Sequence, residues 1–139
     1  MTNDVVNGIS VALYENFKDV KIYTDEVPQG TKKPCFFILP LDGFETPLIG
    51  DRVQRTMPFV VHYFPKTEKN QELCEVADEL YGVLRRIKLL NGDSLNGLKL
   101  HHEIDSSILF FYVQFKPILR YVTERATEMG TLDQTVGFK

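Results

Sequence analysis

The sequence predicts an α+β domain with the element order α-β-β-β-α-β-β, a mostly antiparallel sheet and two flanking helices. Two segments have the periodicity of amphipathic helices, and the segments around them are alternating or continuously apolar runs bounded by Pro and Gly. A chain of 139 residues is near the commonest size of one domain. We therefore expect a single domain over 1–122 and a polar, aperiodic C-terminal arm over 123–139 that is extended or partly disordered.

The N-terminal part begins with a predicted helix, which Asn3 and Asp4 are placed to cap. Its apolar face comprises Val5, Ile9, Ala12, Leu13 and Phe17. Residues 20–24 alternate between apolar and polar side chains, which indicates a half-buried strand. Residues 34–39 form a continuous apolar run between two prolines, which is typical of a strand covered on both faces.

The middle of the chain contains the second predicted helix. Residues 41–51 include two glycines and one proline without periodicity, so we expect a long mobile loop there. Residues 52–64 are expected to form a long strand, after which Thr67 caps a helix over 68–87. The apolar stripe of this helix comprises Leu73, Val76, Ala77, Leu80, Val83, Leu84 and Ile87.

The final predicted strands form a hairpin of residues 98–105 with residues 108–122. Both faces of the second strand are apolar over 108–115, and the run 34–39 has the same pattern. Antiparallel sheets with one solvated face normally alternate instead, and two helices cover one face of such a sheet more readily than two. Three arrangements would cover the second face: one helix on each face, the C-terminal arm folded back over the sheet, or another copy of the chain.

The strand over 108–122 is unusually long. Its fifteen residues would extend roughly 50 Å at about 3.3 Å per residue, well beyond an ordinary strand. Pro58 and Pro117 fall inside predicted strands, although proline in a sheet is confined to edges and bulges because it donates no ladder hydrogen bond. We expect these prolines to interrupt or bend their strands and to direct the strand ends toward a neighbour.

Histidine and serine side chains do not form a recognisable catalytic or metal site in the sequence. His101 and His102 are adjacent on a strand and therefore point to opposite faces, and His101 shares its face with Glu103 without a third ligand. His62 stands alone and is expected to be a core or interface histidine. In a competing hypothesis, a small-molecule-binding α+β domain, His62, His101 and Tyr112 would be the polar groups of a pocket.

Motifs and charge argue against several other functions. The nucleophile elbow, the phosphate loop and the dinucleotide fingerprint are absent, so we expect no enzymatic activity, no catalytic residue and no cofactor. Lys and Arg total 16 against 19 Asp and Glu, which disfavours nucleic acid binding. No apolar run reaches the ~18 residues of a membrane span. The two cysteines, Cys35 and Cys74, are expected to be buried thiols.

Several segments together resemble a known family. They are VKIYTDEVPQG, PCFFIL, PFVVHYFP, NQELCEVADELYGVL and the final paired strands. The chain resembles the tail terminator (neck) proteins of bacteriophages and prophages of Gram-positive bacteria. The likeness covers nearly the whole chain and rests on the order of elements more than on a chemical motif. Another neck or head-completion protein is the alternative within the same class.

The resemblance implies a structural role without enzymatic activity. Tail terminators form a ring, commonly a hexamer, on the end of the finished tail tube, where they stop tube polymerisation and present a surface for head joining. The implied partners are copies of the same chain, the tail tube protein and the head-completion or connector protein. The implied location is the host cytoplasm during assembly and then the tail or neck of the virion. We predict that the partner-contacting residues are Phe44, Leu48, Ile49, Arg52 and Arg55.

Overall fold

The computed structural model describes residues 1–25, 30, 32–67, 69–125 and 132–138, with the backbone alone after Tyr121. In this part of the chain the elements are, in order, α1 (Thr2–Asn16), β1 (Lys21–Tyr23), β2 (Cys35–Pro40), β3 (Phe44–Pro47), β4 (Arg52–Phe64), α2 (Asn70–Val83), β5 (Arg86–Lys88), β6 (Ser94–Asn96), β7 (Leu98–Asp105), β8 (Ile108–Phe115), β9 (Ile118–Arg125) and β10 (Leu132–Phe138). The predicted α+β fold with two helices and a mostly antiparallel sheet is confirmed.

The main sheet is built around β4, and its described strands have the order β1-β2-β4-β8-β7. Neighbouring strands are antiparallel except for β1, which runs parallel to β2. β3 and β9 pair with the first residues of β4, and β10 pairs with β9. β5 and β6 form a separate two-stranded ribbon.

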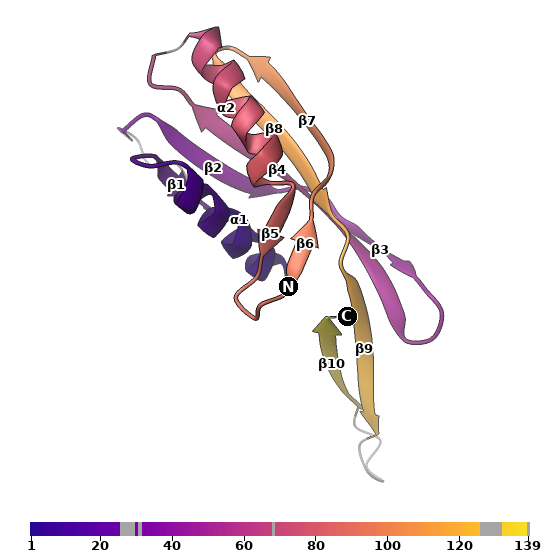
Figure 1. Cartoon of the computed structure of the whole chain (residues 1–139). Coiled ribbons are helices and arrows are strands. Elements are labelled where there is room, and N and C mark those ends of the chain that lie inside the picture. Colours follow the sequence, from indigo (N-terminus) through magenta and orange to yellow (C-terminus); the bar gives the residue numbers. More distant parts are fainter. Residues whose placement is uncertain (26–29, 31, 68, 126–131, 139) are drawn as a thin grey trace.

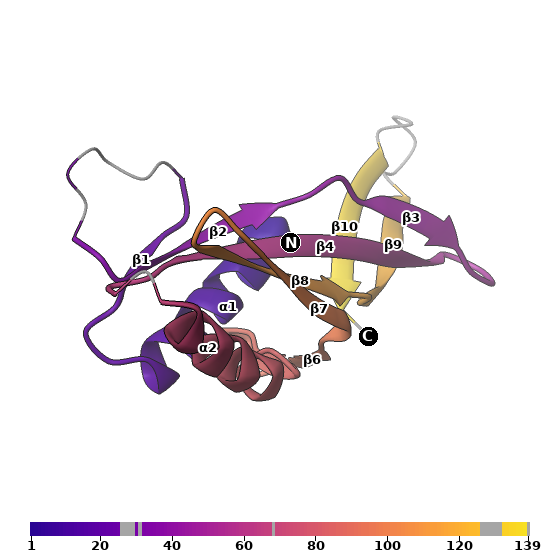
Figure 2. The same cartoon turned by 90° about the horizontal axis from the view of Figure 1, so that it is seen from above.

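Both helices lie on the same face of the sheet (Figure 2). α1 contacts β2 and β5, and α2 contacts β7 and β8. Because side chains alternate along a strand, every second residue of β4 and β8 points into this layer. The largest buried side chains of the sheet are Phe36, Phe59, Phe111 and Phe115. The helices bury Val5, Ile9, Leu13, Leu73, Val76, Ala77 and Leu80 against them, which confirms most of the predicted apolar faces.

β4 continues beyond the helices, so the sheet has two parts (Figure 1). Residues 57–64 lie in the helix-covered body and pair with β2 and β8, whereas residues 52–56 pair with β3 or β9. β9 follows β8 along the same edge of β4 and pairs with β4 in the same antiparallel register. We call the second part the β-extension; it consists of β3, residues 48–56 and residues 118–121. The strands therefore project past the core, as their length predicted.

Two prolines mark the junction between the body and the β-extension. Pro117 separates β8 from β9, as predicted, and its carbonyl accepts a hydrogen bond of 3.0 Å from the Arg55 N–H. Pro58 does not interrupt β4, so that prediction is wrong. It is tolerated because it lies where the partner of β4 changes from β2 to β3, beyond the last β2 pair at Phe59.

The prediction of a mobile loop over 41–51 is wrong, because these residues contain β3 and the turn that leads into β4. β3 has only four residues, and all of them are exposed. No apolar alternation therefore marks it in the sequence, and its Pro47 is acceptable at the end of an edge strand. The ribbon of β5 and β6 was missed because its strands have three residues each.

The second helix is shorter than predicted at both ends: it begins at Asn70 and ends at Val83, and Ile87, predicted in its apolar stripe, lies in β5. Glu72 organises the chain before the helix. The Thr67 N–H and hydroxyl both donate to the Glu72 carboxylate, at 3.0 and 2.6 Å, and the Tyr63 hydroxyl and Lys66 N–H donate to its other oxygen. Partial burial raises the pKa of Glu72, but these hydrogen bonds outweigh it and lower the pKa to about 2. Thr67 therefore does not cap α2, which begins at Asn70.

Other predicted boundaries also shift. α1 begins at Thr2 without a side-chain cap, so the predicted caps Asn3 and Asp4 are wrong. The predicted start of the second helix at 68 lies outside the described residues. Within the predicted C-terminal arm, 123–139, the described residues form the end of β9 and the antiparallel β10; residues 126–131 and 139 lie outside the described part.

Candidate assembly surface

The face of the sheet opposite the helices is largely apolar. Residues paired across neighbouring strands point to the same side, so the register forms a row of Phe37, His62 and Phe110 from β2, β4 and β8. β8 shows the contrast directly, because its residues alternate between half-buried and buried. We call this surface the open face because no described helix packs on it; it comprises Cys35, Phe37, Leu39, Pro58, Val60, His62, Phe64, Ile108, Phe110, Tyr112 and Gln114. Cys35 and Val60 are buried among their neighbours, and the other members are half-buried.

His62 lies among three aromatic rings of the open face. Its ring centroid is 4.7 Å from that of Phe110, 5.8 Å from that of Phe37 and 6.4 Å from that of Phe64. Burial lowers the pKa of His62 from its ordinary value of 6.5, so the ring is neutral at pH 7 and the face carries no charge at this point. His62 therefore packs in an aromatic cluster on the sheet face opposite the helices, and its predicted place at an interface stays a prediction.

The open face also contains an unsatisfied polar atom. Gln114 Oε1 is buried and accepts no hydrogen bond from the residues that the structure describes. A buried acceptor without a donor costs free energy of about 1–3 kcal/mol. This face therefore combines half-buried aromatic rings with a buried acceptor that has no donor among the described residues.

Two of the three predicted ways to cover this face find no support in the fold. One helix on each face is wrong, because both helices pack on the other side (Figure 2). The described end of the chain does not lie over the body either, since β10 pairs with β9 beside the β-extension (Figure 1). The third arrangement, cover by another copy of the chain, stays a prediction.

The predicted contact residues lie together on the β-extension, at the projecting end of the sheet. Phe44 is 61% exposed, Leu48 38% and Ile49 86%, and Arg52 is also exposed. Arg55 differs, because its guanidinium forms an ion pair with Glu45 inside the β-extension. The guanidinium of Arg55, which was predicted to contact a partner chain, thus already has an acidic partner within its own chain.

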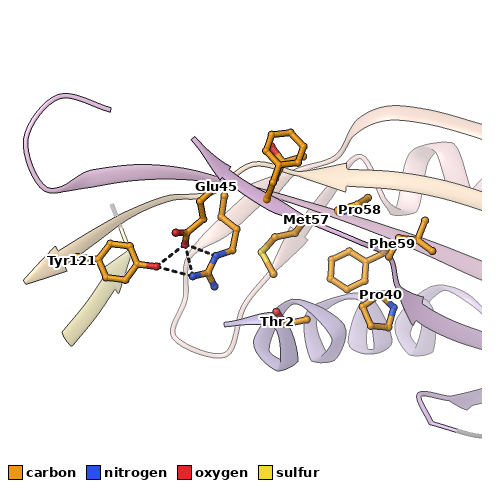
Figure 3. A pocket seen from close by; sticks show the side chains of 12 residues that line it. Thr2, Pro40, Glu45, Met57, Pro58, Phe59 and Tyr121 are labelled. Carbon is orange, nitrogen blue, oxygen red and sulfur yellow. Dashed lines mark hydrogen bonds and ion pairs between the residues drawn. The ribbon is translucent and has the colours of Figure 1, made fainter. Parts of the chain in front are cut away.

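A pocket of about 350 Å³ lies where the β-extension joins the body (Figure 3). Its apolar lining includes Pro40, Met57 and Phe59, and Thr2 of α1 also lines it. The polar side is a cluster of Glu45, Arg55 and Tyr121. Sequence reasoning missed Glu45 and Tyr121, because they are 76 residues apart and only the β-extension brings them together.

The histidines and Tyr112, which were considered for a pocket or a metal site, do not come together in one site. His101 stacks on Tyr112, whereas His102 contacts the Tyr81 hydroxyl through Nδ1, so the two histidines do point to opposite faces. Neither His62, His101 nor Tyr112 lines the pocket at the β-extension. No group of three or more potential metal ligands occurs among the described residues. No helix in that part of the chain is long and apolar enough to span a membrane.

The cysteines give a mixed result. Cys35 is buried, and burial raises the pKa of its thiol, as expected for an unreactive side chain. Cys74 is exposed, so the prediction of a buried thiol is wrong there. The reason is that α2 turns only one stripe toward the sheet, and Cys74 lies just outside it, between the buried Leu73 and the exposed Glu75.

A helix-backed sheet with an uncovered aromatic face and a projecting β-extension is typical of a structural protein that assembles with other chains. The family model of the phage tail terminator protein matches residues 4–128 of the chain. The chain therefore belongs to the phage tail terminator family, a family of structural proteins of the virion tail, and the resemblance noted from the sequence is confirmed. A search among curated proteins gives no match.

Proposed function

We propose that the chain forms a closed ring, a hexamer as the family resemblance implies, on the end of the tail tube. The ring ends tube polymerisation and provides the surface on which the head-completion or connector protein docks. The chain acts without catalysis. It assembles in the host cytoplasm and remains at the tail or neck of the virion.

The open face is the observation that carries this proposal. A row of half-buried aromatic side chains on a sheet face without a helix, in a protein of the tail terminator family, supports burial against a second chain. Burying one aromatic side chain completely contributes about 1.5–3 kcal/mol, so several rings together can support an oligomer.

Ring closure requires two different contact surfaces on each subunit. A heterologous contact joins one patch of a subunit to a different patch of the next and closes when the rotation per subunit divides a full turn. The open face and the β-extension lie on different parts of the molecule (Figure 1). The β-extension has exposed apolar side chains, and the open face has half-buried ones. In the proposal, these two surfaces supply the contacts with sister subunits and with the tube.

Tube growth tests this function directly. Purified tail tube protein of the same phage is polymerised with and without the chain, and tube lengths are measured by negative-stain electron microscopy. We expect shorter tubes with extra density at one end when the chain is present. The matched control is Phe110→Arg, which places a charge on the open face and should not shorten the tubes. Unchanged tube lengths with the wild-type chain would contradict the proposal.

A further inference from the structure

We propose that Glu45, Arg55 and Tyr121 are positioning residues for assembly, because they hold the β-extension in one orientation before a partner binds. We call these three residues the Glu45 clamp. The inference rests on the proposed function, in which the β-extension contacts neighbouring components. It assigns Arg55 a role inside the subunit in place of the predicted direct contact with a partner.

The β-extension depends on such contacts because it has only a small hydrophobic core of its own. No described helix lies behind it (Figure 1), and all four residues of β3 are exposed. Leu119 is a fully buried apolar side chain there, but it has few comparable neighbours. A few short strands without a packed apolar face are only marginally stable in water. Polar contacts must therefore contribute much of what fixes the strands together.

The clamp joins three strands through one carboxylate. Glu45 Oε2 accepts a hydrogen bond of 2.9 Å from Arg55 Nε–H and one of 2.6 Å from the Tyr121 hydroxyl. Arg55 also donates to the Tyr121 oxygen at 3.1 Å, so each residue contacts the other two. Glu45 and Arg55 are direct partners across β3 and β4, and Tyr121 comes from β9. Hydrogen bonds to an ionised carboxylate are among the stronger ones in proteins.

The clamp lies at the junction between the β-extension and the body. It forms the polar side of the pocket between the β-extension and the body, near Thr2, Met57 and Phe59 (Figure 3). Hydrogen bonds from Tyr121 and then from Arg55 lower the pKa of Glu45, so the carboxylate stays ionised at neutral pH. A segment that is already ordered loses less conformational entropy on binding. The clamp therefore favours a β-extension that docks preformed.

Hydrogen exchange of the isolated chain tests the first half of the inference. The variants are Glu45→Gln and Tyr121→Phe, which remove an acceptor charge or a hydroxyl and preserve size. We expect backbone amides of 44–56 to exchange roughly 2- to 10-fold faster, the factor given by one net hydrogen bond, with unchanged exchange in α1, α2 and β8. The matched control is Arg120→Gln, which breaks the exposed ion pair with Asp51 and should have little effect.

Ring formation of the same variants, followed by sedimentation velocity, tests the second half. We expect both clamp variants to need a several-fold higher concentration to form the ring. The double variant should lose no more free energy of assembly than the two single variants lose together. Unchanged exchange at 44–56, or faster exchange throughout the body, would overturn the clamp. Faster exchange with normal ring formation would overturn its positioning role and leave the proposed function intact. If the wild-type chain itself forms no ring, the proposed function fails and the positioning role fails with it.

Discussion

Phe110 and Phe111 are adjacent on β8 but point to opposite faces of the sheet, so their alanine variants separate the open face from the core. Phe111 is fully buried against the helices. Its replacement by alanine should lower the free energy of unfolding by about 3–5 kcal/mol. Phe110 is only half-buried in the isolated chain. Its replacement should lower that free energy by about 1–2 kcal/mol, in proportion to the area it already hides.

Urea unfolding followed by circular dichroism measures this difference, at a protein concentration at which the chain is monomeric. With a slope of about 2 kcal/mol per molar urea, the midpoint should fall by roughly 2 M for Phe111→Ala and by less than about 1 M for Phe110→Ala. The order should reverse for assembly, in which Phe110→Ala weakens ring formation at least about tenfold. Equal losses of stability would refute the reasoning, because they would mean that the open face is already covered within one chain.

Four further predictions concern pH and backbone packing. The pKa of Glu72 is about 2 in the folded chain, against an ordinary 4.5. The stabilisation from this group is therefore present above about pH 4.5 and is lost as the pH falls toward 2. Glu72→Gln should flatten the plot of unfolding free energy against pH in this range. Because burial lowers the pKa of His62, the unfolded chain takes up a proton first, and the free energy of unfolding of the monomer should fall below about pH 6.5; His62→Phe should remove that slope. Gly43→Ala should destabilise the junction of β2 and β3 by about 1–3 kcal/mol in urea unfolding, because the added Cβ would lie 2.6 Å from the Thr56 carbonyl oxygen. Gly82→Ala in α2, where the added Cβ meets open space, should instead stabilise the chain by about 0.5–1 kcal/mol.

The body of the fold was predictable because its elements have a strong apolar pattern. The strand boundaries at 52–64 and 98–105 agree with β4 and β7, and the continuous apolar run 34–39 is β2 within one residue. The apolar residues on the two sides of β8 form a buried set that faces the helices and a half-buried set on the opposite face. These features follow from side-chain periodicity, which the sequence displays directly.

The β-extension was not predictable in the same way. β3 is short, exposed and ends in a proline, so it has the composition of a loop. Its strand structure comes from pairing with β4, and the contact of Glu45 with Tyr121 depends on β9 continuing the register of β8 past Pro117. Long-range pairing of this kind leaves no local pattern, which is why Arg55 was assigned to a partner rather than to Glu45.

Sedimentation velocity of the wild-type chain beside Phe110→Arg, over a range of concentrations and with the tail tube protein present or absent, tests most directly whether sister subunits cover the aromatic side of the sheet. We expect the wild-type chain to form one discrete oligomer larger than a dimer, and the variant to remain a folded monomer. A wild-type chain that stays monomeric under every condition, or a variant that forms the same oligomer, would contradict the account.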